Sequence, residues 1–122
     1  MNPLMLVVDD QEELRLLAML TLAPLGRVDC AAGTAGAREL IARERPDVLI
    51  LDIVLGGADN GLDLCRALKA DPALQSIRIV LLSACGQQSD IDAGLASGAD
   101  RYGVKPFSPE GLFATVAELL PQ

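Results

Sequence analysis

The chain has 122 residues, of which 51% are hydrophobic, and a formal net charge of -7. This length suits one domain with a single core, and the hydrophobic content excludes a disordered chain. The acidic balance and the lack of a basic run argue against direct contact with nucleic acid.

Histidine is absent, and the three cysteines are Cys30, Cys65 and Cys85. The missing histidine removes the commonest general base and means that this chain cannot carry a phosphohistidine. The cysteines are odd in number and lack metal-type spacing, so we expect reduced thiols in a cytoplasmic protein. No apolar stretch reaches membrane-spanning length, and the N-terminus has no basic region before a long apolar segment. We therefore expect neither a membrane span nor a signal peptide.

Apolar runs alternate with helix-like spacing along the whole chain. The runs predict buried strands, and the periodic segments predict helices. In chain order, the pattern predicts a strand at Leu4–Val8, a helix at Glu12–Leu22, a strand at Val28–Ala31, a helix at Thr34–Arg45, a strand at Val48–Leu51, a helix at Leu62–Ala70, a strand at Ile79–Leu82, a helix at Asp90–Ala96, a strand at Arg101–Val104 and a last helix after the N-cap Ser108. Five strand–helix units of this kind predict an α/β fold with a parallel sheet and right-handed crossovers.

The helical spacing also predicts which side chains face the core. The inward residues of the first helix are expected to be Leu14, Leu17, Ala18 and Thr21. Those of the last helix are expected to be Leu112, Val116, Leu119 and Leu120. The low apolar content of the helix Asp90–Ala96 predicts an exposed or mobile element.

Polar residues follow four of the strands, namely Asp9-Asp10, Asp52, Ser83 and Lys105-Pro106. Ligands of parallel sheets bind beyond the carboxyl ends of the strands, so these side chains are expected to converge. Carboxylates about 4 Å apart repel by roughly 4 kcal/mol per pair at an effective dielectric near 20, so such a cluster needs a cation. Mg²⁺ suits it, because this ion takes oxygen ligands and phosphate.

Each of these residues also has a plain structural interpretation. Asp10 is placed to cap the helix that follows it, and Ser83 to satisfy local backbone groups at a strand end. Lys105 is placed as a solvated lysine before a proline turn. The coincidence of all of them at strand ends favours the functional interpretation.

The sequence resembles a response-regulator receiver domain of bacterial two-component signalling over essentially its whole length, residues 1–122. The matching segments are Val7–Asp10, Leu49–Asp52, Leu81–Ala84 and Gly98–Phe107. The resemblance implies a doubly wound, flavodoxin-like three-layer sandwich, with a five-stranded parallel sheet of order 2-1-3-4-5 and five helices.

The resemblance also implies residue roles. Asp52 would be the phosphoacceptor, and Asp10, Asp52 and the backbone carbonyl of Val54 would ligate Mg²⁺ or Mn²⁺. Asp9 would belong to the metal site through metal-bound water. Ser83 would donate its hydroxyl to the phosphoryl group, and Lys105 would pair with Asp52 and then with that group. The resemblance further implies that the Lys105–Pro106 peptide bond is cis. It also implies a conformational switch that couples Ser83 to Tyr102.

The implied phosphodonor is a sensor histidine kinase or a histidine phosphotransfer protein. The implied output is a downstream protein or a fused output domain, with no direct nucleic-acid or membrane partner. Such a chain is a phosphoacceptor that catalyses its own phosphorylation and not a turnover enzyme. Whether it is a standalone regulator or one module of a longer protein stays open.

The loop after Asp52 departs from the family pattern. The family typically has proline four residues and glycine eight residues after the phosphoacceptor, where this chain has Gly56 and Asn60, with glycine at Gly61. This spacing indicates one inserted residue and leaves the metal geometry at Val54 in question. Because apolar Val54 offers no hydrogen bond to an attacking water, we expect slow self-dephosphorylation. Cys85 is interpreted as a small filler residue, with a redox-sensitive thiol as the alternative.

Two other functions are compatible with parts of this pattern. A Mg²⁺-dependent phosphohydrolase with an aspartyl nucleophile usually carries a second acid at the place held here by Val54, which argues against turnover. A degenerate receiver would be an interaction module independent of phosphorylation, and the inserted loop residue keeps that alternative open. A nucleotide site is unsupported, because Asp9-Asp10-Gln11 stands where a glycine-rich phosphate loop would follow the first strand.

Overall fold

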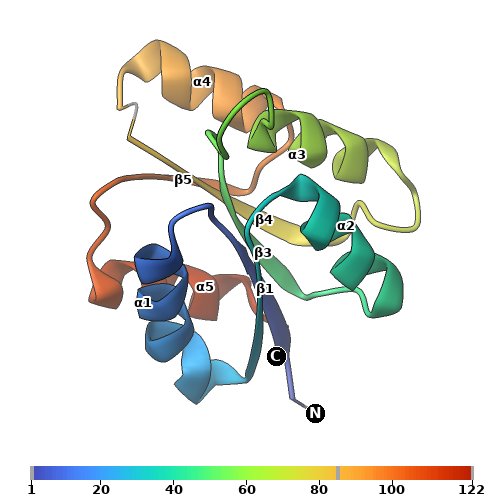
Figure 1. Cartoon of the computed structure of the whole chain (residues 1–122), viewed down its shortest axis with the longest axis vertical. Coiled ribbons are helices and arrows are strands. Elements are labelled where there is room, and N and C mark those ends of the chain that lie inside the picture. Colours follow the sequence, from blue (N-terminus) through green and yellow to red (C-terminus); the bar gives the residue numbers. More distant parts are fainter. Residues whose placement is uncertain (1, 85, 122) are drawn as a thin grey trace.

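A computed structural model describes residues 2–84 and 86–121 of the chain (Figure 1). Its elements alternate between strands and helices, as the sequence pattern predicts. In chain order they are β1 (Leu4–Val8), α1 (Glu12–Leu22), the 3₁₀ turn η1 (Ala23–Leu25), β2 (Arg27–Ala31), α2 (Thr34–Arg43), β3 (Val48–Asp52), α3 (Gly61–Ala70), β4 (Arg78–Ser83), α4 (Gln88–Ala96), β5 (Arg101–Val104) and α5 (Pro109–Leu119).

The five strands form one parallel sheet in the order β2-β1-β3-β4-β5, which confirms the expected topology. Helices cover both faces: α1 and α5 lie on one side, and α2 and α3 on the other (Figure 1). The arrangement is the expected doubly wound three-layer sandwich.

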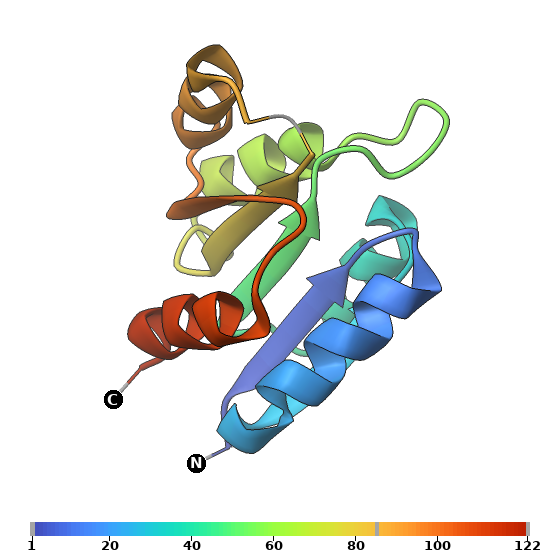
Figure 2. The same ribbon diagram turned by 90° about the vertical axis from the view of Figure 1, so that its left-hand side faces the viewer.

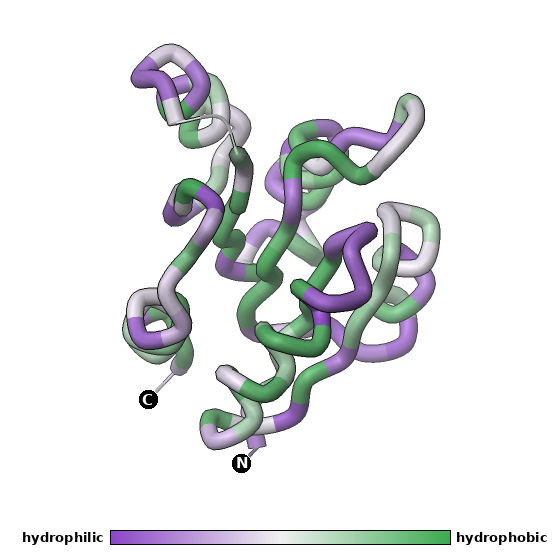
Figure 3. The backbone as a smooth tube through the Cα atoms, turned by 60° about the vertical axis from the view of Figure 1, so that its left-hand side comes forward, coloured by the Kyte–Doolittle hydropathy of each residue, from purple (hydrophilic) through white to green (hydrophobic). Residues whose placement is uncertain are grey.

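Alternate residues of the central strands supply two separate cores. Leu49 and Leu51 of β3 pack toward α2 and α3, whereas Val48 and Ile50 pack toward α1 and α5. Every residue of β1 and β3 is buried, because helices cover both faces of the sheet. Figure 3 shows the resulting hydrophobic stretches along the central strands.

Several element ends differ from the sequence-based expectation. Helix α2 ends at Arg43 and not at Arg45, because Glu44 already has extended backbone angles (φ -154°, ψ 121°). Pro46 then follows, and the residue before a proline is disfavoured in helical conformation. Helices α3 and α4 begin earlier than expected, at Gly61 and Gln88.

The prediction for the inward face of α1 is partly wrong. Ala18 is buried as expected, but Leu17 is 38% exposed. Leu14 and Leu17 instead line a shallow surface pocket with Pro106 and Phe107, beside the face that packs on the sheet. Leu22, one turn further along α1, is buried together with Ala18, so the line of contact with the core runs through these two residues and Leu17 lies beside it.

The last two helices follow the prediction more closely. Leu112 and Val116 of α5 are buried, whereas Leu119 and Leu120 are half-buried at the end of the helix. In α4 only Gly94 is buried, so the expected exposure of this helix is confirmed. None of the helices in the described part of the chain is both long and apolar enough to cross a membrane.

Candidate functional site

The polar residues singled out in the sequence meet at the carboxyl edge of the sheet. Asp9 directly follows β1, Asp52 and Ser83 are the last residues of β3 and β4, and Lys105 directly follows β5. The arrowheads of the central strands point to this common edge in Figure 2. Parallel pairing therefore brings together side chains that lie up to 96 residues apart in sequence.

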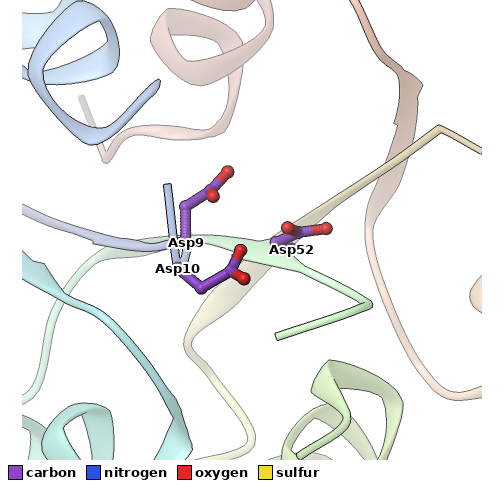
Figure 4. A group of neighbouring side chains, drawn as sticks. All are labelled: Asp9, Asp10 and Asp52. Atoms are coloured by element: carbon purple, nitrogen blue, oxygen red, sulfur yellow. The ribbon is translucent and has the colours of Figure 1, made fainter. Parts of the chain in front are cut away.

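Three carboxylates form the centre of the site. Each of Asp9, Asp10 and Asp52 offers an oxygen, and these oxygens all lie within 4.8 Å of one another (Figure 4). Asp9 and Asp52 are 4% and 6% exposed, whereas Asp10 is exposed to solvent. Two buried acids and one exposed acid at this spacing form a strongly negative pocket that opens to solvent on one side.

Lys105 forms ion pairs with two of these carboxylates. Its Nζ lies 2.9 Å from Oδ2 of Asp9 and 3.0 Å from Oδ2 of Asp52. Its backbone N–H donates to the carbonyl oxygen of Ser83 at 2.8 Å, which ties the end of β5 to the end of β4. The peptide bond between Lys105 and Pro106 is cis.

The pKa shifts of Asp52 and Lys105 reflect a buried site in which two carboxylates, Asp9 and Asp52, share one lysine. Burial raises the pKa of Asp52, and the hydrogen bond and charge of Lys105 offset only part of this effect. Burial acts to lower the pKa of Lys105, but hydrogen bonds to Asp9 and Asp52 raise it more, so its pKa lies above the ordinary value. Both shifts mean that Asp52 and Lys105 hold their protons more tightly in the folded chain than the free side chains do. A divalent cation would relieve the same excess of negative charge.

The open side of the site is a pocket of about 270 Å³ whose lining includes Asp10, Asp52, Val54, Ser83 and Lys105. Ser83 is 2% exposed and ends β4 beside Asp52, since its neighbour Leu82 pairs with Asp52 in the sheet. A carboxylate, a hydroxyl and an ammonium group therefore line one small cavity. This combination can align and neutralise a phosphoryl group.

The segment between β3 and α3 folds back on itself beside this pocket. Val54 and Asn60 form an antiparallel bridge, and the N–H of Gly61 donates to the carbonyl oxygen of Ile53 at 2.7 Å. A Cβ on Gly61 would overlap the carbonyl oxygen of Asp52, so only glycine fits at this crossing. The expected loop is thus a closed, hairpin-like turn whose base rests on the end of β3.

The capping interpretation of Asp10 is wrong. The N-cap of α1 is Gln11, and no side chain caps this helix; instead, the N–H of Gln11 donates to Oδ1 of Asp9 at 2.9 Å. The Asp10 carboxylate lies with Asp9 and Asp52 (Figure 4).

Sequence reasoning did not identify Arg15 as part of the site. The guanidinium of Arg15 donates to the backbone carbonyl of Asp9 at 2.7 Å. A contact with a main-chain oxygen leaves no residue-type signal that could have predicted it.

Tyr102 lies away from the carboxylates, on β5 opposite Leu81. Its ring rests against α4 at Gly94, where an added Cβ would come within 2.6 Å of Cε2 of the ring. The structure thus places this aromatic ring between β5 and α4, a helix in which only Gly94 is buried. Cys85, the suggested filler or redox thiol, lies outside the described residues.

The donor set fits a hard divalent cation. Three carboxylates offer oxygen ligands only, and the site contains no soft sulfur or imidazole donor among the described residues. Mg²⁺ and Mn²⁺ prefer such oxygen sites, and Mg²⁺ typically retains water and takes one or two carboxylates.

Comparisons with known proteins agree with this geometry. Residues 5–117 match the family model described as the response regulator receiver domain. The chain is 40% identical over 98% of its length to the phosphate regulon transcriptional regulatory protein PhoB of Rhizobium meliloti. It is 44% identical over 95% of its length to the DNA-binding response regulator MtrA of Mycolicibacterium smegmatis. It covers 53% and 50% of these two relatives, so it spans about half their length.

Solved structures show the same fold. A putative response regulator from Chloroflexus aurantiacus matches with a TM-score of 0.90 and 33% identity, over 100% of both chains. A receiver domain described as BeF3-activated DrrB matches with a TM-score of 0.86 and 30% identity, over 98% of this chain and 97% of that one. With its parallel sheet, its acidic pocket and its lysine at the end of β5, this chain belongs to the response regulator receiver domain family.

Proposed function

We propose that this receiver domain accepts a phosphoryl group on Asp52 from the phosphohistidine of a sensor histidine kinase or a histidine phosphotransfer protein. The observation that carries the proposal is the position of the Asp52 carboxylate: it is 6% exposed, bonded to Lys105 and faces the pocket lined by Ser83. Family membership supports the general role in two-component signalling.

In the proposed transfer, a carboxylate oxygen of Asp52 forms a P–O bond as the P–N bond of the phosphohistidine breaks. The bonding electrons of the broken bond stay with the imidazole nitrogen. Lys105 and the Ser83 hydroxyl are placed to bind the oxygens of the transferred group and to lower the cost of its charge. No general base is needed, because a carboxylate is already ionised when it attacks.

The residues that would hold Mg²⁺ or Mn²⁺ are Asp10, Asp52 and the backbone carbonyl of Val54, with Asp9 beside them. When bound, the ion would supply positive charge that neutralises the phosphoryl oxygens and the carboxylate cluster. Val54 is 63% exposed and apolar, so its side chain offers no hydrogen bond to an attacking water. We therefore expect the phosphoryl group on Asp52 to hydrolyse slowly.

The output step would couple Ser83 to Tyr102. Ser83 ends β4, Lys105 directly follows β5, and the two share a backbone hydrogen bond, so movement at the phosphoryl group would reach β5 directly. Tyr102 already contacts α4, whose only buried residue is Gly94, so a shift of the ring would change an exposed surface. We propose a cytoplasmic protein whose signal passes to a partner or to a fused output domain, as in the DNA-binding relatives.

Intact-mass spectrometry with Mg²⁺ and acetyl phosphate tests the phosphoacceptor. The wild type should gain one phosphoryl increment, and Asp52→Asn should gain none. Amide spectra should show shifts that reach Tyr102 and α5 only when the group is attached. No adduct on the wild type would refute the proposal and would favour an interaction module independent of phosphorylation.

A further inference from the structure

The N-terminus of α2 is capped by a residue from a distant loop. Its own N-cap, Gly33, has no side chain to accept a hydrogen bond. Oδ2 of Asp59 accepts from the N–H of Thr34 at 2.9 Å, and Oδ1 accepts from the Thr34 hydroxyl at 2.6 Å. Asp59 lies 25 residues further along the chain, in the loop between β3 and α3. The contact therefore joins the loop beside the phosphoacceptor to a separate helix.

Three features indicate that the surroundings of Asp59 favour this contact. A Cβ on Gly33 would lie 2.8 Å from Oδ2 of Asp59, so glycine leaves the space that the carboxylate occupies. A helix N-terminus favours a negative charge, which matches the direction of the contact. Hydrogen bonds from Thr34 lower the pKa of Asp59, so the carboxylate stays ionised.

The neighbouring residue, Asn60, makes an equivalent contact with the other helix. Its Oδ1 accepts from the N–H of Leu62 at 2.7 Å and caps α3. The loop thus caps two helices with two consecutive side chains. A loop with one residue fewer between Asp52 and Gly61 would have to place these two caps differently.

The contact bears directly on the carbonyl proposed as a metal ligand. Val54 bridges Asn60, so holding the Asp59–Asn60 strand of the turn also holds Val54 across from it. The turn passes close to the acids, since a Cβ on Gly56 would lie 3.5 Å from Oδ2 of Asp10. Gly56 and Gly57 have positive φ (91° and 56°) and carry no side chain, so the backbone at the exposed tip of the turn is less restricted than that of other residues.

We propose that Asp59 is a positioning residue: its contact with Thr34 holds the loop in place beside the acidic cluster and raises the affinity of the site for Mg²⁺. This inference rests on the proposed function, because it concerns the same metal site. Without the contact, the turn keeps its internal backbone bonds, which run from Gly61 to Ile53 (2.7 Å), from Asp59 to Gly56 (3.1 Å) and from Leu55 to Asp59 (3.4 Å), but it loses these two hydrogen bonds to α2. The ordered form would then be less populated, and the apparent affinity would fall by the same fraction.

The test compares Mg²⁺ titrations of the full chain, followed by amide NMR, for the wild type, Asp59→Ala and Asp59→Asn. The asparagine side chain keeps an oxygen that can accept from the Thr34 N–H and gains an NH₂ group that can donate to the Thr34 hydroxyl. It removes the negative charge. We expect the Mg²⁺ Kd of Asp59→Ala to rise about fivefold, the factor typical of one lost N-cap. We expect Asp59→Asn to stay within about twofold of the wild type, by the same comparison of capping residues.

Asp71→Ala is the matched control for charge and stability. Asp71 accepts from the N–H of Ala73 at 2.9 Å in the turn after α3, near the opposite edge of the sheet. This variant should bind Mg²⁺ like the wild type. In acetyl phosphate assays, Asp59→Ala should need more Mg²⁺ for half-maximal phosphorylation but should reach the wild-type rate at saturation. A purely structural defect would lower the saturated rate instead.

The outcomes separate the two proposals. Equal Mg²⁺ affinity in Asp59→Ala and the wild type would overturn the positioning role and leave the phosphoacceptor role intact. Equal losses in Asp59→Ala and Asp59→Asn would also overturn it, because charge alone would explain them. If the wild type neither binds Mg²⁺ nor gains a phosphoryl increment, both proposals fail.

Discussion

Replacing Lys105 by methionine tests the electrostatic account of the site. The change keeps most of the aliphatic stem but leaves Asp9 and Asp52, the two carboxylates that Lys105 contacts, without their lysine. The side chains of Lys105, Asp9 and Asp52 are 15%, 6% and 8% exposed, so solvent screens their interaction poorly. Loss of this ion pair is therefore expected to cost far more than loss of a surface pair.

The expected magnitude follows from three estimates. At an effective dielectric near 20, charges about 3 Å apart attract by roughly 5–6 kcal/mol before desolvation is counted. Removing one partner of a buried pair usually costs about 3–5 kcal/mol. In the variant, Asp52 can also bind a proton and so lose its unpaired charge, which costs about 4 kcal/mol at pH 7 for an acid of ordinary pKa. We expect Lys105→Met to lose about 3–4 kcal/mol of unfolding free energy in the absence of Mg²⁺.

The loss should depend on pH in a defined direction. Burial already raises the pKa of Asp52, and removing Lys105 raises it further. The folded state of the variant then binds more protons than the unfolded state, so its stability increases as pH falls from 7 toward 5. Mg²⁺ at saturation should recover part of the loss, because it binds the folded state.

Urea unfolding followed by circular dichroism measures these effects, with chelator or with Mg²⁺. Arg66→Met is the control, since it removes one positive charge from an ion pair whose side chains are 57% and 74% exposed. That variant should lose less than about 1 kcal/mol. A loss below about 1 kcal/mol for Lys105→Met, or a loss that is independent of pH, would refute the reasoning.

Other expected outcomes concern the support of the site. Asp100→Ala should lose about 1–3 kcal/mol in urea unfolding, because the carboxylate accepts from the Ile79 N–H at 2.8 Å and from Lys69 at 3.1 Å. In the wild type, burial acts to raise the pKa of Asp100, but these bonds lower it overall. Its stabilising contribution is therefore complete above its unfolded pKa of about 3.9 and declines as pH falls through the lower folded value. Gly94→Ala should displace the Tyr102 ring, since the new Cβ would lie 2.6 Å from Cε2. Unchanged aromatic NMR shifts of Tyr102 in that variant would contradict the described packing.

Local pattern in the sequence was enough to predict the strands, the helices and the candidate acids. Residues of a central parallel strand are apolar on both faces, so Leu4–Val8 and Val48–Leu51 stand out without any knowledge of their neighbours. Parallel strands end at one edge of their sheet, so Asp9, Asp52 and Lys105 could be grouped before any distance was known. The order of the strands was implied by the family resemblance, because one buried apolar strand looks like another.

Only the tertiary structure decided which partners those residues meet. It showed that Asp10 joins the acidic cluster and leaves α1 uncapped, and that Leu17 is 38% exposed beside Pro106. It also brought Asp59 onto Thr34, a contact that depends on how a loop from one strand crosses the start of another helix. The periodicity of a segment shows only which of its residues face the protein interior and which face solvent. It does not show which other segment packs against it, and contacts such as that of Asp59 with Thr34 depend on that packing.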